Sequence, residues 1–316
     1  MTLTLRAVET VTVILTGLLA GIVAQRRGLR RELSPRITRF TLTFAEPIPI
    51  ALSLWGLRAD EPQAFILPAL AVALVVAMWP VGHVVGRTAG LRGRSLGAFV
   101  GSSMFSNVGI TYGAFLCYAL LGERGVALGY LYCASFVPTL YILGFWVAGQ
   151  YGRSGQSAWA AFRETITRPD SRNPIIGVMV GLGLMFARVS RPSLAPLIVN
   201  LLVPMTTFSY MFAIGLSMEF SAMLGYWRPA LLMHMIKFVI SPIVGLAMGL
   251  ALSLPRLGPD LLPVLFIESA TPSAIMSLVL AQAKELDVQL ANACWLATNL
   301  TAIALAPLWL YIASVL

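Results

Sequence analysis

The sequence predicts an all-α membrane protein with ten transmembrane helices, on the basis of its composition, its apolar runs and the placement of its basic residues. Of its 316 residues, 58% are hydrophobic and 11% are charged, and the mean hydropathy is +0.82. Soluble domains carry about 25% charged residues, so this chain has too few charges to cover a water-facing surface. The chain is therefore expected to lie in a membrane.

Ten apolar runs are bounded by charged residues or by Gly and Pro, and they have about the 17 to 25 residues that a helix needs to cross a bilayer. The first five lie at 7–24, 37–57, 64–86, 96–121 and 126–149. The second five lie at 174–189, 194–218, 229–252, 261–283 and 289–315. The segment between the two groups, 150–173, has aromatic and basic residues at spacings that favour a short amphipathic helix on the cytoplasmic membrane surface.

The basic residues predict the orientation, because Arg and Lys concentrate in short cytoplasmic loops. Fifteen of them fall in the loops that follow spans one, three, five, seven and nine, whereas six fall on the other side. Both termini are therefore expected on the non-cytoplasmic side of the cytoplasmic (inner) membrane. The net charge of +9 follows from this arrangement. Binding to nucleic acid is not expected, because the basic residues lie in short loops between spans.

The sequence argues against a membrane enzyme. Its two histidines are scattered, and its three cysteines, Cys117, Cys133 and Cys294, all fall within apolar runs. No group has the spacing of metal ligands or of a catalytic site, so no cofactor is expected beyond a coupling ion, either sodium or a proton. The sequence also lacks a Gly-x-x-x-x-Gly-Lys-Ser/Thr loop for ATP and the repeated filter sequence or rings of charge that a channel would need.

The ninth span carries an acid, two hydroxyl residues and a proline, Glu268-Ser269-Ala270-Thr271-Pro272, inside an otherwise apolar run. This segment is predicted to break its helix at membrane depth, where freed backbone groups survive only if protein or a water-filled cavity surrounds them. Interrupted helices of this kind bind cargo and ions in transporters. Glu268 is therefore predicted to couple transport to an ion, either as a proton carrier or as a ligand for sodium.

The fourth span contains a matching polar stretch. Moving the second half back by 164 positions superposes the span boundaries and places Asn107 opposite Thr271 and Gly109 opposite Ser273. Asn107 can bond freed backbone groups and Gly109 weakens the helix, so a second break is predicted. A continuous helix whose small residues allow close packing is the alternative. Because each half has five spans, an odd number, the two halves are predicted to form a five-plus-five inverted repeat.

Several segments resemble the auxin efflux carriers and their bacterial relatives, a family within the bile, arsenite and riboflavin transporter superfamily. The strongest stretch begins with Phe105-Ser106-Asn107-Val108-Gly109-Ile110 and continues through 121–128, and further pieces lie at 21–28, 172–174, 212–218, 270–272 and 279–281. The resemblance thus covers nearly the whole chain. It departs from the plant carriers at Val108, where they have proline. Local similarity to the bile acid:sodium symporters lies at 106–108 and 267–268.

The resemblance implies a first repeat at 1–149, a cytoplasmic linker at 150–173 and a second repeat at 174–316. Spans one, two, six and seven would form a scaffold, and spans three to five and eight to ten a transport domain. In that family the broken fourth and ninth helices cross near the membrane midplane and hold an organic anion, such as a dicarboxylate or an aromatic acid. Half-helix N-termini suit such a carboxylate. The expected activity is secondary active transport by alternating access, with efflux favoured. A sodium-coupled symporter of bile-acid-like or other organic anions is the alternative, a channel is the less favoured reading, and a homodimer is left open.

The residues expected to contact the cargo lie at the two breaks or on scaffold spans two and seven: Ser106, Asn107, Gly109, Thr111, Thr271, Pro272, Ser273, Glu46 and Tyr210. Ion coupling is assigned to Glu268. Lys237 in the eighth span is either its counter-ion or a side chain that reaches toward the cytoplasmic interface. His234, three residues earlier on the same helical face, either extends a proton relay or is simply hydrogen-bonded. Sodium at Glu268 is the alternative to a proton, although Gly129 and Cys133 stand where the symporters place hydroxyl ligands.

Overall fold

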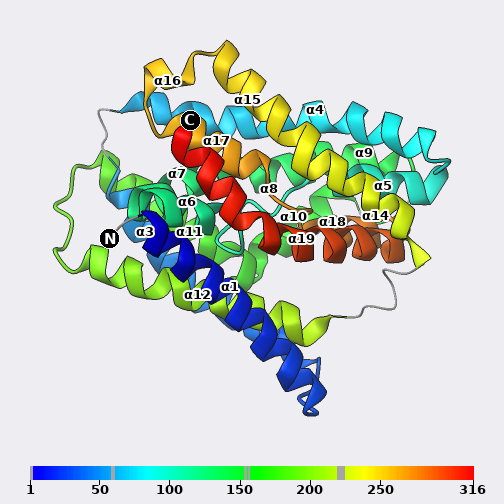
Figure 1. Cartoon of the computed structure of the whole chain (residues 1–316), viewed down its shortest axis with the longest axis horizontal. Coiled ribbons are helices and arrows are strands. Elements are labelled where there is room, and N and C mark those ends of the chain that lie inside the picture. Colours follow the sequence, from blue (N-terminus) through cyan, green and yellow to red (C-terminus); the bar gives the residue numbers. More distant parts are fainter. Residues whose placement is uncertain (1–2, 58–60, 153–154, 156, 219–224) are drawn as a thin grey trace.

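The protein is built of helices, as a computed structural model of residues 3–57, 61–152, 155, 157–218 and 225–316 shows (Figure 1). Within these ranges the only β-type pairing is an isolated antiparallel bridge between Ser106 and Ser273. The prediction of an all-α protein is therefore confirmed for the described part of the chain.

The helices of the first half are α1 (Leu3–Arg26), α2 (Leu33–Phe40), the π-helical turn η1 (Thr41–Ala45), α3 (Pro47–Trp55), the short η2 (Pro62–Ile66), α4 (Leu67–Thr88), α5 (Gly93–Met104), α6 (Gly113–Leu121), α7 (Glu123–Cys133), α8 (Phe136–Thr139), η3 (Leu140–Gly144) and α9 (Phe145–Gly149). Helix α10 (Ala158–Thr167) follows in the linker. The second half has α11 (Pro169–Phe186), α12 (Ala195–Ser217), α14 (Trp227–Met235), η4 (Ile236–Ile240), α15 (Ser241–Ala251), α16 (Leu254–Leu257), α17 (Leu261–Ser269), α18 (Met276–Ala283) and α19 (Val288–Val315).

Six helical stretches of the described chain are long and apolar enough to cross a membrane: Val8–Arg26, Pro62–Thr88, Glu123–Gly149, Ala195–Ser217, Trp227–Ala251 and Val288–Val315. They coincide with predicted spans one, three, five, seven, eight and ten. Two of the other predicted spans, 96–121 and 261–283, are each divided between two shorter helices by a non-helical segment. The structure thus supports a multi-pass all-α membrane protein, and the count of ten crossings remains a prediction.

Two pairs of helices pack through glycines at very short distances. Helix α1 lies along α12, and α11 lies along α3. A Cβ atom added at Gly21 of α1 would lie 2.2 Å from the carbonyl oxygen of Phe212, and one added at Gly181 of α11 would lie 2.6 Å from that of Ala51. Both glycines are therefore required for the close approach of the backbones, as in small-residue contacts between membrane helices.

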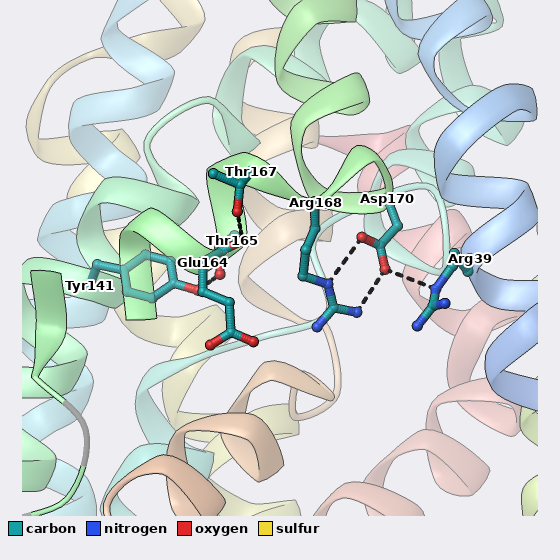
Figure 2. A network of polar contacts seen from close by, with 7 residues as sticks. All are labelled: Arg39, Tyr141, Glu164, Thr165, Thr167, Arg168 and Asp170. Carbon is teal, nitrogen blue, oxygen red and sulfur yellow. Dashed lines mark hydrogen bonds and ion pairs between the residues drawn. The ribbon is translucent and has the colours of Figure 1, made fainter. Parts of the chain in front are cut away.

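The C-terminal part of the linker between the two halves is held by contacts on two sides (Figure 2). The carboxylate of Asp170 accepts a hydrogen bond from Arg168 at 2.9 Å and lies 3.5 Å from Nε of Arg39, which is in α2. In the last turn of α10, the hydroxyl of Thr165 shares a hydrogen bond with that of Tyr141 in η3. The segment from Thr165 to Asp170 therefore contacts residues of predicted spans two and five at the same time.

Candidate functional site

Two non-helical segments interrupt the predicted fourth and ninth spans and lie against each other. The first runs from 105 to 112, between α5 and α6, and the second from 270 to 275, between α17 and α18. The backbone N–H of Asn107 donates to the carbonyl of Pro272 at 2.8 Å, and that of Ala274 donates to the carbonyl of Phe105 at 3.0 Å. Each segment thus supplies partners for backbone groups that the other cannot satisfy within its own helix, as apolar surroundings require.

Local sequence explains the two interruptions differently. In the second segment, Pro272 has no N–H to continue the helix, and its ring disfavours helical geometry at Thr271. In the first segment, Phe105 adopts an extended conformation with φ −102° and ψ 128°, and Gly109 follows shortly after it. A Cβ atom added at Gly109 would meet no other atom within 4 Å. The predicted break in span four is therefore present without a proline at Val108.

Helix α19 ties the two segments together through a pair of neighbouring side chains. The amide of Asn299 accepts a hydrogen bond from Asn107 Nδ2 at 3.2 Å and donates to the carbonyl of Ser273 at 3.0 Å. The hydroxyl of Thr298 accepts from the backbone N–H of Ser273 at 3.1 Å. Ser273 also donates its own hydroxyl to the carbonyl of Ser102 at 3.0 Å. These contacts hold Asn107 and Ser273, both predicted cargo residues, in one polar network.

Glu268 lies in the last turn of α17 and is fully buried, with 0% exposure. Its carboxylate faces two glycines: a Cβ atom added at Gly113 would lie 2.2 Å from Oε2, and one added at Gly129 would lie 2.9 Å from Oε1. The thiol of Cys117 donates a long hydrogen bond of 3.8 Å to Oε1. Among the described residues, Oε2 has no hydrogen-bond partner. The acid thus occupies a space that exists only because α6 and α7 carry glycine there.

A cavity of about 20 Å³ lies beside the first segment. Its walls include Phe105, Ser106 and Val108, together with the hydroxyl residues Ser135 and Thr139. This volume holds about one water molecule, so an organic acid would need the surrounding helices to move apart. Of the other residues predicted to meet cargo, Thr111 is half-buried in the turn before α6, and Thr271 donates its hydroxyl to the carbonyl of Glu268 at 2.8 Å.

Comparison with known proteins identifies the class of protein. Residues 159–310 match a family described as membrane transport protein. An uncharacterized transporter of Methanocaldococcus jannaschii is 25% identical over 312 residues, covering 95% of this chain and 97% of the relative. These matches support a membrane transporter, in agreement with the resemblance of the chain to the auxin efflux carriers. A second uncharacterized transporter, from Methanothermobacter thermautotrophicus, is 23% identical to this transporter, and the aligned region covers 95% of this chain and 96% of the relative.

The proteins to which this transporter is similar are transporters and not enzymes. The arrangement of its polar residues agrees with that class. In the described ranges, no three His, Cys, Asp or Glu side chains come together as they would around a metal ion. The polar groups instead surround backbone breaks inside apolar helices, as the cargo sites of many transporters do.

Glu46 and Tyr210, predicted to face cargo from the two scaffold halves, contact each other. Glu46 lies at the start of α3 and is buried, and it accepts hydrogen bonds from the hydroxyl of Tyr210 in α12 and, at 2.6 Å, from that of Tyr130 in α7. Neither residue is bonded to the two non-helical segments within the described chain. The hydroxyl of Thr207 in α12 does reach that region, since it donates to the carbonyl of Ile110 at 3.1 Å.

Lys237 of the transporter is placed differently from either prediction. It is fully buried in η4, so it does not reach an aqueous interface, and no ion pair joins it to Glu268 in the described chain. Its ammonium group instead donates to the carbonyls of Ser103 and Phe105 and to the hydroxyl of Ser106. These carbonyl oxygens belong to the C-terminal end of α5. The partial negative charge of a helix C-terminus stabilises a nearby cation more than a distant carboxylate could.

His234 of the transporter is hydrogen-bonded on both ring nitrogens, which corresponds to the simpler of its two predicted roles. Nδ1 contacts the carbonyl of Ala230 at 2.6 Å, and Nε2 contacts the hydroxyl of Thr301 in α19 at 2.7 Å. Sequence reasoning missed Thr298, Asn299 and Thr301 of α19 altogether. The signal was present, since three polar residues within four positions are unusual in an apolar span, but no proline or acid marked them.

Proposed function

We propose that this transporter moves a small organic anion, such as a dicarboxylate or an aromatic acid, across the cytoplasmic membrane by alternating access, in the direction of efflux. One observation carries this proposal: two interrupted helices, distant in sequence, are joined backbone to backbone inside apolar surroundings, and a buried acid lies beside them. Non-helical backbone at membrane depth is tolerated where it lines a cargo site.

The chemistry of the joined segments favours an anion. Helices α6 and α18 both begin just after the interruptions, at Gly113 and Met276. Helix N-termini carry partial positive charge, which attracts carboxylates. The amide of Asn107 and the open space at Gly109 lie in the same stretch and would complete such a site. A membrane-embedded carboxylate could then bind without a dedicated arginine.

We further propose ten crossings in two inverted repeats, with the fourth and ninth helices crossing and both termini on the non-cytoplasmic side. The helix packing supports this division. In an inverted repeat, span one of the first half corresponds to span six, and span seven corresponds to span two. Helix α1 packs on α12 and α11 packs on α3 through glycines, which are the equivalent pairs, and these four helices would form the scaffold.

The proposed movement must break the polar contacts between scaffold and transport domain. The hydrogen bond from Tyr130 of α7 to Glu46 of α3 is one, and that from Thr207 of α12 to the carbonyl of Ile110 is another. Each such bond contributes about 1 kcal/mol to the conformation in which it forms. The bond from Tyr118 of α6 to Asn200 of α12 and the ion pair between Glu123 and Arg191 cross the same boundary and must also open in the transport cycle.

Replacing Tyr130 with Phe is expected to shift the balance between the two conformations by roughly fivefold, because about 1 kcal/mol of hydrogen bonding to Glu46 is lost. The measurement is the accessibility of cysteines introduced into the scaffold interface, in parallel with the rate of cargo exchange. Tyr311→Phe is the matched control, since Tyr311 is 66% exposed in α19. Equal accessibility in Tyr130→Phe and the unchanged protein would show that this bond does not separate the two conformations.

We propose that a proton, bound at Glu268, is the coupling ion. The carboxylate lies against Gly113 and Gly129 and accepts a long hydrogen bond from the thiol of Cys117, and one carboxylate oxygen has no partner among the described residues. A hard cation requires several oxygen ligands, whereas a proton requires only the carboxylate itself. Sodium coupling remains the second candidate, because Glu268 lies at the carbonyl end of α17, where broken helices coordinate sodium.

The decisive experiment is flux into proteoliposomes of labelled dicarboxylates and aromatic acids, with proton and sodium gradients imposed separately. A carrier shows saturable uptake and counterflow, whereas a channel shows neither. Uptake that follows only the proton gradient supports Glu268 as a proton carrier. Uptake that requires sodium would overturn proton coupling, and the absence of anion flux under every gradient would overturn the proposed cargo.

Replacing Asn107 with Ala is expected to weaken cargo binding by roughly tenfold, because a good hydrogen bond to a charged group contributes about 1.5 kcal/mol or more. The variant also loses the link from Asn107 to Asn299, so the protein's Tm is measured beside the concentration dependence of uptake. Asn200→Ala is the control, since Asn200 lies in α12 and bonds only the exposed hydroxyl of Tyr118 among the contacts described. Unchanged affinity in Asn107→Ala would remove this residue from the cargo site.

A further inference from the structure

The ammonium group of Lys237 lies inside a cage of oxygen atoms at the end of α5. Its distances are 2.8 Å to the carbonyl of Ser103, 3.1 Å to the carbonyl of Phe105 and 2.8 Å to the hydroxyl of Ser106. The side chain has 0% exposure. The cage contains no carboxylate, so what opposes the charge is the partial negative charge of the helix end.

This donor set is one that a desolvated monovalent cation uses. Broken membrane helices coordinate such ions with unwound backbone carbonyls and the carbonyl ends of half-helices. Here two carbonyls and a hydroxyl converge on one point, and the nitrogen of a side chain occupies that point. A lysine stem can deliver its charge from a neighbouring helix, because the four-carbon chain spans the distance between packed backbones.

The corresponding helix C-terminus in the second half of the molecule is that of α17, and it carries an acidic side chain. Ser241, four residues after Lys237 in the same span, donates its hydroxyl to the carbonyl of Ser269 at 2.6 Å at the end of α17. The last turn of that helix carries Glu268, whose Oε2 has no partner among the described residues. One helix end therefore holds a fixed positive charge, and the other holds an acid.

We propose that Lys237 is a tethered cation: it fills permanently, at the end of α5, a position that would otherwise bind an alkali ion. This inference rests on the proposed function and deepens it, since it assigns the exchange of the coupling ion to the Glu268 end alone. The Lys237 charge then moves with the joined segments through the whole cycle and partly offsets the charge of an anionic cargo. Sodium has no place at the α5 end of the native protein.

The test is chemical replacement of the missing cation. Lys237→Ala removes three carbons and the ammonium group, which is the propylammonium ion. The purified variant is heated in equal concentrations of sodium, propylammonium and choline chloride, and its Tm is recorded. We expect a Tm roughly 5 °C below that of the unchanged protein, as loss of a buried charge contact implies, and a saturable recovery in propylammonium or sodium but not in choline.

Three further proteins make the outcome decisive. Lys237→Met keeps the length of the stem without the charge, so it should lose stability and should not recover with any cation. Arg256→Ala, at an exposed residue of α16, is the control and should show neither loss nor recovery. In Glu268→Gln, which keeps Lys237, sodium should give no saturable stabilisation. Three results would each overturn the proposal. Lys237→Met could be as stable as the unchanged protein, the loss of stability in Lys237→Ala could persist in every cation, or sodium could bind saturably to Glu268→Gln.

These measurements need no cargo, so they fail or succeed separately from the proposed function. If Lys237→Ala does not fold in choline, it is purified in propylammonium, and failure to fold there as well counts against the tethered cation. If a cation restores the Tm of Lys237→Ala but proteoliposomes show no anion flux, the tethered cation is supported and the organic-anion carrier is rejected. If proteoliposomes show anion flux but no cation restores that Tm, the carrier is supported and the tethered cation is rejected.

Discussion

Replacing Glu268 with Gln is expected to leave exchange of cargo in place and to abolish its response to an imposed pH gradient. The glutamine has nearly the same shape, so it fits beside Gly113 and Gly129, but it cannot take up and release a proton. Because Oε2 of the native residue has no partner in the described chain, the amide leaves few existing bonds unmade. Gradient-driven accumulation in proteoliposomes should fall to the level of passive equilibration, while counterflow continues.

The control for this substitution is Glu9→Gln, because Glu9 has an exposed side chain in α1. It should accumulate cargo as the unchanged protein does. If Glu268→Gln still accumulated cargo in response to a pH gradient, the proton would be carried elsewhere. If it instead lost a dependence on sodium, the coupling ion would be sodium and the carboxylate one of its ligands.

Replacing Gly113 with Ala is expected to displace Glu268 and to reduce coupled transport at least tenfold. The added methyl group would lie 2.2 Å from Oε2 of Glu268 and 3.0 Å from Cγ2 of Thr271. Overpacking of this kind costs about 1–3 kcal/mol, so the protein's Tm should also fall by several degrees. Thermal unfolding and gradient-driven uptake are measured on the same preparation.

Two variants show whether the clash with the acid is the cause. Gly183→Ala adds the same methyl group in α11, where it would meet no neighbouring atom within 4 Å; it should not lower the Tm, because alanine favours a helix over glycine, and it should leave uptake unchanged. Shortening the acid, as Glu268→Asp in the Gly113→Ala background, should recover part of the lost stability, since contacting residues are not additive. If Gly113→Ala alone were as stable and as well coupled as the unchanged protein, the acid would not be held against α6.

The sequence predicted the elements of the site better than its contacts. Pro272 marked the second interruption, because a proline cannot continue a helix, and the polar residues around Asn107 indicated the first. The acid at Glu268 stood out against its apolar run. All three are properties of a residue and its near neighbours, which is why they could be read without knowing the fold.

The partners of Lys237 could not be read in the same way. Sequence reasoning pairs a charged side chain with an opposite side chain, but Lys237 bonds the backbone at Ser103 and Phe105, and every residue has a carbonyl. The roles of Gly113 and Gly129 were equally hidden, since a glycine that makes room for an acid resembles one that packs against a helix. Asn299 lies in an unbroken helix, where its polar neighbours Thr298 and Thr301 were a signal but did not show which segment it would contact.

The pairing of Ser106 with Ser273 limits how the protein can change shape. Its bonds run from main chain to main chain, so no substitution of a side chain short of proline removes them. A gate that opened by parting these two segments would have to expose unpaired peptide groups to hydrocarbon, at a cost of several kcal/mol each. For the proposed alternating access, we therefore expect the two segments to move together as one rigid piece.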